Sequence, residues 1–362
     1  MITRKSKKGQ TDVQLHWIFI LIAGGIILAF FVSLAVWYQG QQETKLENTI
    51  VGKLQTLFTT ARESPRTAKP LQIPEMTLTF TCDPNGCSEY GCASEFSGGG
   101  VSKSTEAEVI FSPKILQGSF LVTWSLPWLV PFPVTNFLYV TNDKIRYLVI
   151  YDDNDSQAEQ LATAVNDELQ QNSYLNKQFI SLSELSSVEN YQDVHVRAVL
   201  FSNALPSSTV RETLTTIYGS AYDLIVITGT VHEGTITFFS GDTDEKVEYF
   251  ELPLLIGGIF SPSQAEYRCN LHKALFRLKV VATNYKNTLS FYQENLPLEK
   301  GYCSVNYYQP LVAESLITML DAAESALADE ETRINAQLFA DVITALNEVN
   351  QNLVIKDCPR VY

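Results

Sequence analysis

The longest apolar stretch of the chain lies near its N-terminus. From Trp17 to Tyr38, 22 residues follow one another without a charge. At about 1.5 Å per helical residue they match a hydrocarbon core of roughly 30 Å. Aromatic residues stand at both ends, where they favour the two membrane interfaces. The pattern predicts a transmembrane helix over residues 13–38, preceded by a basic cytoplasmic tail of residues 1–12.

The flanking charges predict the orientation of this span. Arg4, Lys5, Lys7 and Lys8 precede it, whereas the first charged residue after it is Glu43. Because cytoplasmic flanks carry the excess of Lys and Arg, we expect a single-pass protein of the cell membrane. Its N-terminus would be cytoplasmic and its C-terminal domain extracytoplasmic, with the lipid bilayer as one partner.

Small residues recur inside the span at four-residue spacing. Gly25, Ala29 and Ser33 would share one helix stripe, and such a stripe lets a second helix approach closely. We therefore expect a protein partner or self-association through this face.

An amphipathic pattern follows the span. Apolar residues recur at steps of three and four, as on one helix face; they are Leu46, Ile50, Leu54, Leu57, Phe58 and Ala61. Prolines at 65, 70 and 74 come next and predict an irregular segment. Residues 39–74 are accordingly interpreted as an amphipathic stalk and linker.

Residues 75–143 are typical of a small β-rich subdomain that contains cysteines. Short alternating or apolar runs predict strands; they are Met76–Phe80, Val109–Phe111 and Phe120–Trp124. The Gly- and Ser-rich segment Ser94–Ser104 predicts an exposed loop. Prolines interrupt the aromatic stretch Trp128–Tyr139, which favours extended or edge segments. This stretch is either a docking surface or a packed wall between subdomains, and the wall is favoured.

The pattern changes at residue 144. Apolar runs without alternation predict strands covered on both faces; they are Tyr147–Tyr151, Val196–Phe201, Leu224–Ile227 and the weaker Thr235–Phe239. Helical patterns separate the first three runs, so residues 144–260 predict an open, mostly parallel α/β sheet.

Residues 261–362 predict helices. Ser261 and Pro262 form a cap and first-turn pair for a long helix that ends near Gln293. Residues 311–328 and 331–350 predict an antiparallel pair. The predicted fold class is therefore α/β: an N-terminal transmembrane helix and stalk, a small β-rich subdomain, and a mostly parallel sheet with C-terminal helices.

The net charge of the chain argues against a nucleic-acid-binding function. The chain carries a net charge of -14, which divides into +3 on residues 1–38 and -17 on the remainder. An acidic outer region repels nucleic acids and anionic lipid head groups. We expect no nucleic-acid partner.

All six cysteines follow the predicted span. They are Cys82, Cys87, Cys92, Cys269, Cys303 and Cys358. An even number outside the cytosol favours disulfides. Three bridges allow 15 connectivities, and an N-terminal cluster of three requires one or three bridges to the later chain. The alternative is zinc, bound by the cluster with Cys269 or His272.

An acidic cluster, Asp152–Ser156, follows the first parallel-type strand. Asp153 and Asp155 have the spacing of the paired aspartates in haloacid-dehalogenase-like phosphatases, and ligand sites of open α/β sheets lie at the carboxyl ends of strands. Helix initiation by this cluster is the favoured alternative. Asn154 also begins a glycosylation sequon. Neither a phosphate-cradling glycine loop nor a local signature of nucleophilic catalysis is present in the sequence, so we expect no cofactor.

The N-terminus resembles a known family. Lys7-Lys8-Gly9-Gln10, followed by the apolar run, resembles the class III signal peptide of archaeal type IV pilin-like proteins. The resemblance implies cleavage after Gly9, which leaves Gln10 as the mature N-terminus. The family's Glu at the fifth mature position is Gln14 here. The run from His16 to Phe31 is also similar to the start of membrane-anchored surface proteins of small-genome archaea.

Three functional hypotheses result from the sequence. The first is a membrane-anchored extracytoplasmic interaction or surface-assembly protein without catalysis. The second is a pilin-like filament subunit cleaved after Gly9. The third is a metal-dependent phosphoesterase that uses Asp153 and Asp155.

Overall fold

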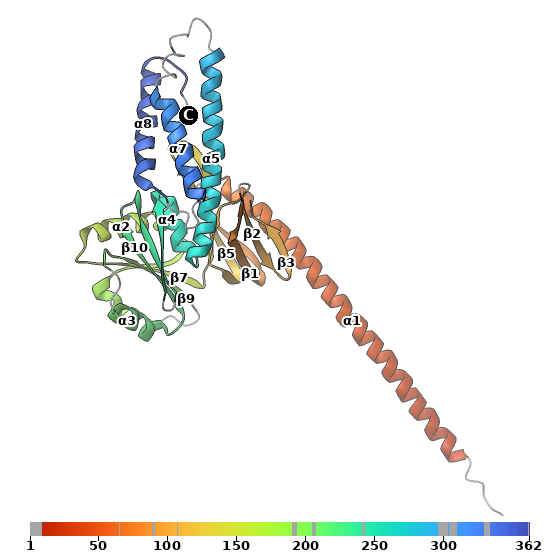
Figure 1. Ribbon diagram of the computed structural model, residues 1–362. Coiled ribbons are helices and arrows are strands. Elements are labelled where there is room, and N and C mark those ends of the chain that lie inside the picture. Colours follow the sequence, from red (N-terminus) through yellow and green to blue (C-terminus); the bar gives the residue numbers. More distant parts are fainter. Residues whose placement is uncertain are drawn as a thin grey trace, which may run out of the picture.

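A long helix, two six-stranded sheets and a group of C-terminal helices make up the protein (Figure 1). The computed structural model describes residues 9–362 except the following: 65, 89–90, 107, 190–193, 205–207, 241–242, 296–302, 304–309, 329–333 and 361. Side chains are not described at residues 9–20, 36, 38–48, 91, 240, 243, 292–295 and 310–314. The chain is thus a mixed α/β protein, as its patterning predicts.

Helix α1 (Gly9–Arg62) is continuous over 54 residues and projects far from the body (Figure 1). Among its described side chains, those that pack on the body lie in its C-terminal part: Val51, Leu54, Phe58 and Ala61 are at most 4% exposed. The predicted amphipathic face is therefore confirmed for Leu54, Phe58 and Ala61, whereas the prediction that Leu57 belongs to it is wrong, because Leu57 is 41% exposed. The side chain of Leu46 lies outside the described part. No proline interrupts the helix, which explains how it continues through the expected boundary between span and stalk.

The first sheet contains mainly antiparallel strands in the order β3-β2-β1-β5-β6-β4. Their bounds are β1 (Lys69–Ser88), β2 (Gly91–Gly98), β3 (Val101–Ser104), β4 (Ile110–Phe111), β5 (Ile115–Leu129) and β6 (Pro133–Asn142). Strand β1 begins at Lys69, so the predicted linker to residue 74 is too long. The stretch from Trp128 to Tyr139 is a packed wall, as favoured, because Trp128, Phe132 and Phe137 are at most 1% exposed.

The expected loop Ser94–Ser104 is wrong, because this segment belongs to strands β2 and β3. Cys92, Ser94 and Phe96 alternate inward, and Phe96 lies between Phe58 and Phe80 in the core. The glycines build the hairpin rather than loosen it. Gly99 and Gly100 have φ of 58° and 80° at the turn between the two strands, a backbone conformation that glycine adopts without a steric cost.

The second sheet is mixed, in the order β12-β11-β10-β9-β7-β8. Its strands are β7 (Ile145–Tyr151), β8 (Asn176–Ser181), β9 (His195–Phe201), β10 (Tyr222–Gly229), β11 (Glu233–Ser240) and β12 (Thr243–Phe250). Strands β8, β7, β9 and β10 are parallel, whereas β11 and β12 extend the sheet antiparallel. Helices α2 (Ser156–Gln170) and α3 (Ser208–Tyr218) and the 3₁₀ turn η1 (Leu182–Ser187) connect the parallel strands.

Helix α4 (Glu251–Phe260) lies between the two sheets and was not predicted. Its residues from Leu254 to Phe260 are all buried, so no polar face interrupts the apolar run and the helical period is hidden. Tyr147 and Tyr139 pack on Phe260 from the two sheets. Helix α4 therefore joins the sheets into one core.

Three helices complete the chain: α5 (Gln264–Asn295), α7 (Pro310–Ala328) and α8 (Ala336–Ile355). They stand together above the sheets in Figure 1, and Lys279 pairs with Glu324 at 3.0 Å between α5 and α7. The predicted range holds for α7. The predicted cap of α5 is wrong, because Ser261 ends α4 instead, and α5 begins at Gln264, where the Glu266 N–H donates to Ser263 Oγ at 3.4 Å. Helix α8 begins later than residue 331, because the Asn335 side chain caps it by accepting from the Leu338 N–H at 3.1 Å.

Candidate functional site

The six cysteines form three disulfides: Cys82–Cys269, Cys87–Cys92 and Cys303–Cys358. The expectation of disulfides is confirmed, with one bridge leading from the N-terminal cluster to the later chain. That bridge closes 187 residues and joins β1 to α5, whereas Cys87–Cys92 spans only 5 residues. The long bridge therefore fastens the first sheet to the C-terminal helices.

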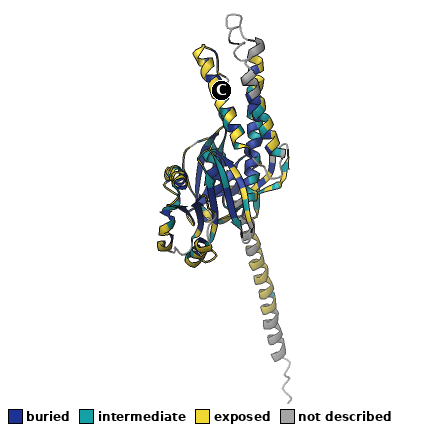
Figure 2. Cartoon of the chain, turned by 60° about the vertical axis from the view of Figure 1, so that its left-hand side comes forward, coloured by how far each residue is buried: buried dark blue, intermediate teal, exposed yellow. Residues whose placement is uncertain are grey.

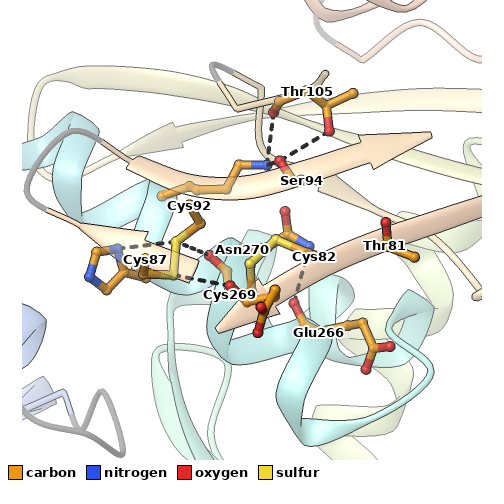
Figure 3. Close-up of a disulfide and its surroundings, with 12 residues drawn as sticks. Thr81, Cys82, Cys87, Cys92, Ser94, Thr105, Glu266, Cys269 and Asn270 are labelled. Carbon is orange, nitrogen blue, oxygen red and sulfur yellow. Dashed lines mark hydrogen bonds between the residues drawn. A yellow bond between two sulfur atoms is a disulfide. The ribbon is translucent and has the colours of Figure 1, made fainter. Parts of the chain in front are cut away.

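Two of these bridges lie side by side where α5 crosses the β1–β2 hairpin (Figure 3). Strand pairing places Cys87 directly opposite Cys92, and Cys82 opposite Ser94. Cys269 belongs to the buried face of α5, so the packing of the helix on the sheet brings its sulfur to the hairpin. The sulfur atoms of Cys87, Cys92 and Cys269 lie within 4.8 Å of one another.

The two bridges differ in accessibility. Cys92 and Cys269 are 1% and 0% exposed, whereas Cys82 and Cys87 are partly exposed. The Cys92 sulfur lies 3.3 Å from Nδ1 of His272 and 3.5 Å from the carbonyl oxygen of Cys269. Burial lowers the pKa of His272, which favours its neutral imidazole.

Zinc ligation needs cysteine thiolates. The cysteines of the expected zinc set form the disulfides Cys82–Cys269 and Cys87–Cys92, so none of them is a thiolate. Only His272 of that set retains a free donor atom beside them. The zinc alternative is therefore wrong for the oxidised protein that the structure describes.

Lys273 is a buried amine next to this cluster. Its Nζ donates to Ser94 Oγ at 2.9 Å and to the carbonyl oxygen of Thr105 at 3.0 Å. Burial lowers its pKa to about 7, against the opposing effect of Glu108 and Glu106. The two hydrogen bonds match the two N–H groups of a neutral amine. Sequence patterning did not single out Lys273, because a lysine on an amphipathic helix ordinarily faces solvent.

The acidic cluster at the carboxyl end of β7 initiates helix α2. One oxygen of Asp155 accepts from the N–H groups of Gln157 and Ala158 at 3.0 and 3.1 Å. Its other oxygen accepts from the Asn203 amide at 2.6 Å. Hydrogen bonding to Ala158 and its other neighbours lowers the pKa of Asp155. These contacts are those of a helix cap, the interpretation that the sequence favoured.

Asp153, the other aspartate of the phosphoesterase hypothesis, lies in the same turn as Asp155. Asp153 is exposed, and a hydrogen bond from Ser183 lowers its pKa. Asp153 and Asp155 therefore engage different segments. Asn154 is exposed in the same turn, where a sugar chain would have room; its glycosylation stays a prediction.

A ligand-sized cavity opens at the other end of the parallel strands, where β7, β9 and β10 begin. It has a volume of about 430 Å³, and Ile115, Tyr147 and Phe260 supply part of its apolar lining. Arg197 lies at its floor, donates to the carbonyl oxygens of Ile259, Gly258 and Ser261, and lies 3.7 Å from Asp223. These contacts use the guanidinium to end helix α4, so its role is structural.

His195 contacts Asp223 at 2.8 Å at the mouth of this cavity. The strand register brings these groups together, because Arg197 pairs with Asp223 across β9 and β10. Aligning the starts of the two predicted strands would have found this juxtaposition from the sequence.

The largest exposed apolar surface belongs to α1. Every described side chain from Leu21 to Ala35 is exposed except Ala23, and Figure 2 shows this exposure along the described part of the helix. Leu28 and Phe30 are 68% and 61% exposed, and Trp37 is 65% exposed. We call residues 21–35 with Trp37 the arm.

The predicted small-residue stripe lies on this arm. Gly25, Ala29 and Ser33 are exposed, and no atom lies within 4 Å of a Cβ built on Gly25. Gly9 and Gln10 begin α1, and their side chains lie outside the described part.

Across the described residues, no helix is long and apolar enough to cross a membrane. The expected span from Trp17 to Tyr38 lies partly outside them, since the side chains of 17–20, 36 and 38 are not described.

Comparisons of the chain with protein-family models, with curated proteins and with solved structures give no match.

Proposed function

We propose that the protein is anchored in the cell membrane by α1 and presents its disulfide-bonded α/β body outside the cytoplasm, as an interaction or surface-assembly component. The observation that carries this proposal is the arm. Its apolar side chains lack any cover among the described residues. Further along the same helix, Val51, Leu54 and Phe58 are packed into the core. Large exposed apolar surfaces mark membrane or protein interaction sites.

Lipid is the favoured cover for the arm, because the arm lies within a longer uncharged stretch that runs from Trp17 to Tyr38. Charged residues resume only where the helix approaches the body. A protein groove would ordinarily cover one face of a helix, whereas the exposed apolar residues of the arm surround its axis. An all-round apolar helix is typical of a membrane span.

The orientation rests on two independent features. The basic residues lie before the span, which favours a cytoplasmic N-terminus. The three disulfides lie after it, and disulfides persist in oxidising compartments. The acidic body would extend from the outer face, where a protein partner or a second copy would meet it. A stripe of Gly25, Ala29 and Ser33 offers a route for helix association within the membrane.

Protease shaving tests this topology. Protease added to intact cells should digest the body, whereas inside-out membrane vesicles should protect it. A body that survives shaving of intact cells would contradict the proposal. A matched variant moves the basic charge: Arg4, Lys5, Lys7 and Lys8 are changed to Gln, and Gln41 and Gln42 to Lys. Its body should become protected in a substantial fraction of molecules, because the charge bias reverses.

A pilin-like filament subunit is the second candidate. It is favoured by the continuity of α1 from Gly9 to Arg62, together with the packing of its C-terminal part on a sheet. Cleavage after Gly9 would leave Gln10 at the first turn of the helix. N-terminal sequencing of the mature protein should then begin at Gln10, and an intact Met1 would remove this candidate.

A further inference from the structure

The most unusual chemistry in the body is the pair of adjoining disulfides at α5 and the β1–β2 hairpin. Four sulfur atoms meet there, and three of them, from Cys87, Cys92 and Cys269, lie within 4.8 Å of one another. Disulfides exchange when a thiolate attacks a neighbouring disulfide sulfur. A thiolate formed on Cys92 would therefore have the Cys82–Cys269 bridge within a short movement.

We propose that this cluster is a thiol–disulfide exchange site. A low-molecular-weight thiol opens Cys87–Cys92, and the disulfide partner of Cys269 on α5, here called the staple, then changes from Cys82 to Cys92. This inference does not depend on membrane anchoring. It assigns a function to the short bridge, which closes only 5 residues and constrains far less chain than its neighbour.

The first step occurs at Cys87, which is partly exposed, whereas Cys92 is 1% exposed. The external thiolate forms a bond to the Cys87 sulfur, and the Cys87–Cys92 bond breaks. Its electron pair leaves on Cys92. His272 Nδ1 lies 3.3 Å from that sulfur, so an N–H at this position hydrogen-bonds the leaving thiolate and stabilises it.

The second step is internal. The Cys92 thiolate attacks the Cys269 sulfur, forming Cys92–Cys269 and releasing Cys82 as a thiolate, which takes a proton from solvent. A second external thiol then cleaves the mixed disulfide on Cys87, giving the Cys87 thiol and the oxidised form of the external thiol. Two external thiols are thus oxidised to one disulfide, and the protein gains two thiols, on Cys82 and Cys87.

The exchange moves the staple between neighbouring strands. Helix α5 is tied to β1 before the exchange and to β2 after it, because Cys82 lies in β1 and Cys92 in β2. The body remains tethered throughout, while two thiols become available on the hairpin. Ser94, which lies opposite Cys82 and accepts from Lys273, stands beside the strand that is released.

Disulfide mapping tests the proposal on the full-length protein. The protein is treated with reduced glutathione at neutral pH, quenched with N-ethylmaleimide and digested with one protease that cleaves before Asp and one that cleaves after Glu. Asp83 separates Cys82 from Cys87, and Glu89 separates Cys87 from Cys92, so the three cysteines fall in different peptides. We expect a first glutathione adduct on Cys87, followed by a Cys92–Cys269 peptide, while Cys303–Cys358 stays intact as the internal control.

Two variants sharpen the test. His272→Asn keeps all six cysteines and should slow the appearance of the Cys92–Cys269 peptide by about tenfold, because the leaving thiolate loses its donor. The double variant Cys87→Ser with Cys92→Ser should make Cys82–Cys269 at least about tenfold slower to open. The proposal is overturned if wild-type protein loses Cys87–Cys92 while Cys82–Cys269 remains, or if the first adduct forms on Cys82.

Discussion

Large apolar side chains in two regions of helix α1 have opposite environments. In the arm, Leu28 and Phe30 are 68% and 61% exposed, whereas Leu54 and Phe58 further along the same helix are 1% and 2% exposed. Hydrophobic side chains drive burial in both places. Among the described side chains of α1, the body covers those near the C-terminal end and leaves those of the arm uncovered.

The packed end is also fixed by polar contacts. The carbonyl oxygen of Arg62 accepts from the Asn136 amide at 2.8 Å, and the Arg66 N–H donates to the Ser125 carbonyl oxygen at 2.7 Å. These bonds tie the exit of α1 to β5 and β6. The helix therefore leaves the body in a set direction, as the proposed membrane anchor would require.

The largest effect is expected from charges in the arm. Each Asp near the centre of a span costs about 2.5–3.5 kcal/mol on insertion, so Ile26→Asp with Phe30→Asp should reduce membrane insertion by more than about a thousandfold. Membrane flotation of the expressed protein measures the loss. Leu57→Asp is the matched control, since Leu57 is an exposed residue of the same helix beyond the arm. Equal flotation of all three proteins would contradict a membrane anchor.

The second-largest effect is expected from removing the Cys82–Cys269 disulfide. The chain-entropy model gives about 5 kcal/mol for a loop of 187 residues and about 2 kcal/mol for one of 5 residues. The Cys82→Ser and Cys269→Ser double variant should therefore lose more than twice the unfolding free energy lost by Cys87→Ser with Cys92→Ser. Urea denaturation of the body under non-reducing conditions measures both. A larger loss of unfolding free energy in the second variant would contradict the claim that Cys82–Cys269 is the more stabilising bridge.

Truncation of matched phenylalanines compares the two ends of α1 directly. Phe58 contacts the rings of Phe80 and Phe96, so Phe58→Ala should cost about 3–5 kcal/mol of unfolding free energy. Phe30→Ala should change it by less than about 0.5 kcal/mol, since no protein core covers that ring. Similar losses in the two variants, measured by denaturation in detergent, would show that the arm packs on the body.

The last effect concerns Lys273 and is the smallest per step of the measurement, since it accumulates gradually with pH. Its pKa is about 7 when folded and 10.5 for an ordinary lysine. Between these values the unfolded chain binds the proton and the folded protein does not, so stability rises with pH, at up to about 1.4 kcal/mol per pH unit. The gain is lost as the pH falls toward 7. Lys273→Met should lack this rise, and parallel stability curves for both proteins between pH 7 and pH 10 would refute it.

The sequence predicted most of what repeats with a period. Helix α7, most of α5 and the parallel strands β7, β9 and β10 follow from apolar spacing and continuous apolar runs, whereas the parallel strand β8, with the mostly polar sequence Asn176–Ser181, was missed. Helix α4 was missed because burial on all sides removes its polar face. The β2–β3 hairpin was missed because small residues such as Ser94 and Gly98 are chosen for close packing, although their composition is that of a loop.

The site was less predictable than the fold. Cysteine number and position predicted disulfides and at least one long-range bridge, but the pairing depends on how α5 crosses the hairpin. Similarly, the burial of Lys273 follows from that crossing, which no local pattern encodes. Asp155 was predictable as a cap because capping is a local interaction.

Depth-dependent fluorescence quenching in lipid vesicles tests the central claim most directly. Phe30→Trp, in a Trp17→Phe and Trp37→Phe background, places an indole at the middle of the arm, and Leu57→Trp in the same background is the control. The account predicts that lipids brominated near the chain ends strongly quench the first variant beyond the background of Trp124 and Trp128, and leave the second at that background. Equal quenching of the two variants, or none, would contradict the anchoring of this protein through α1.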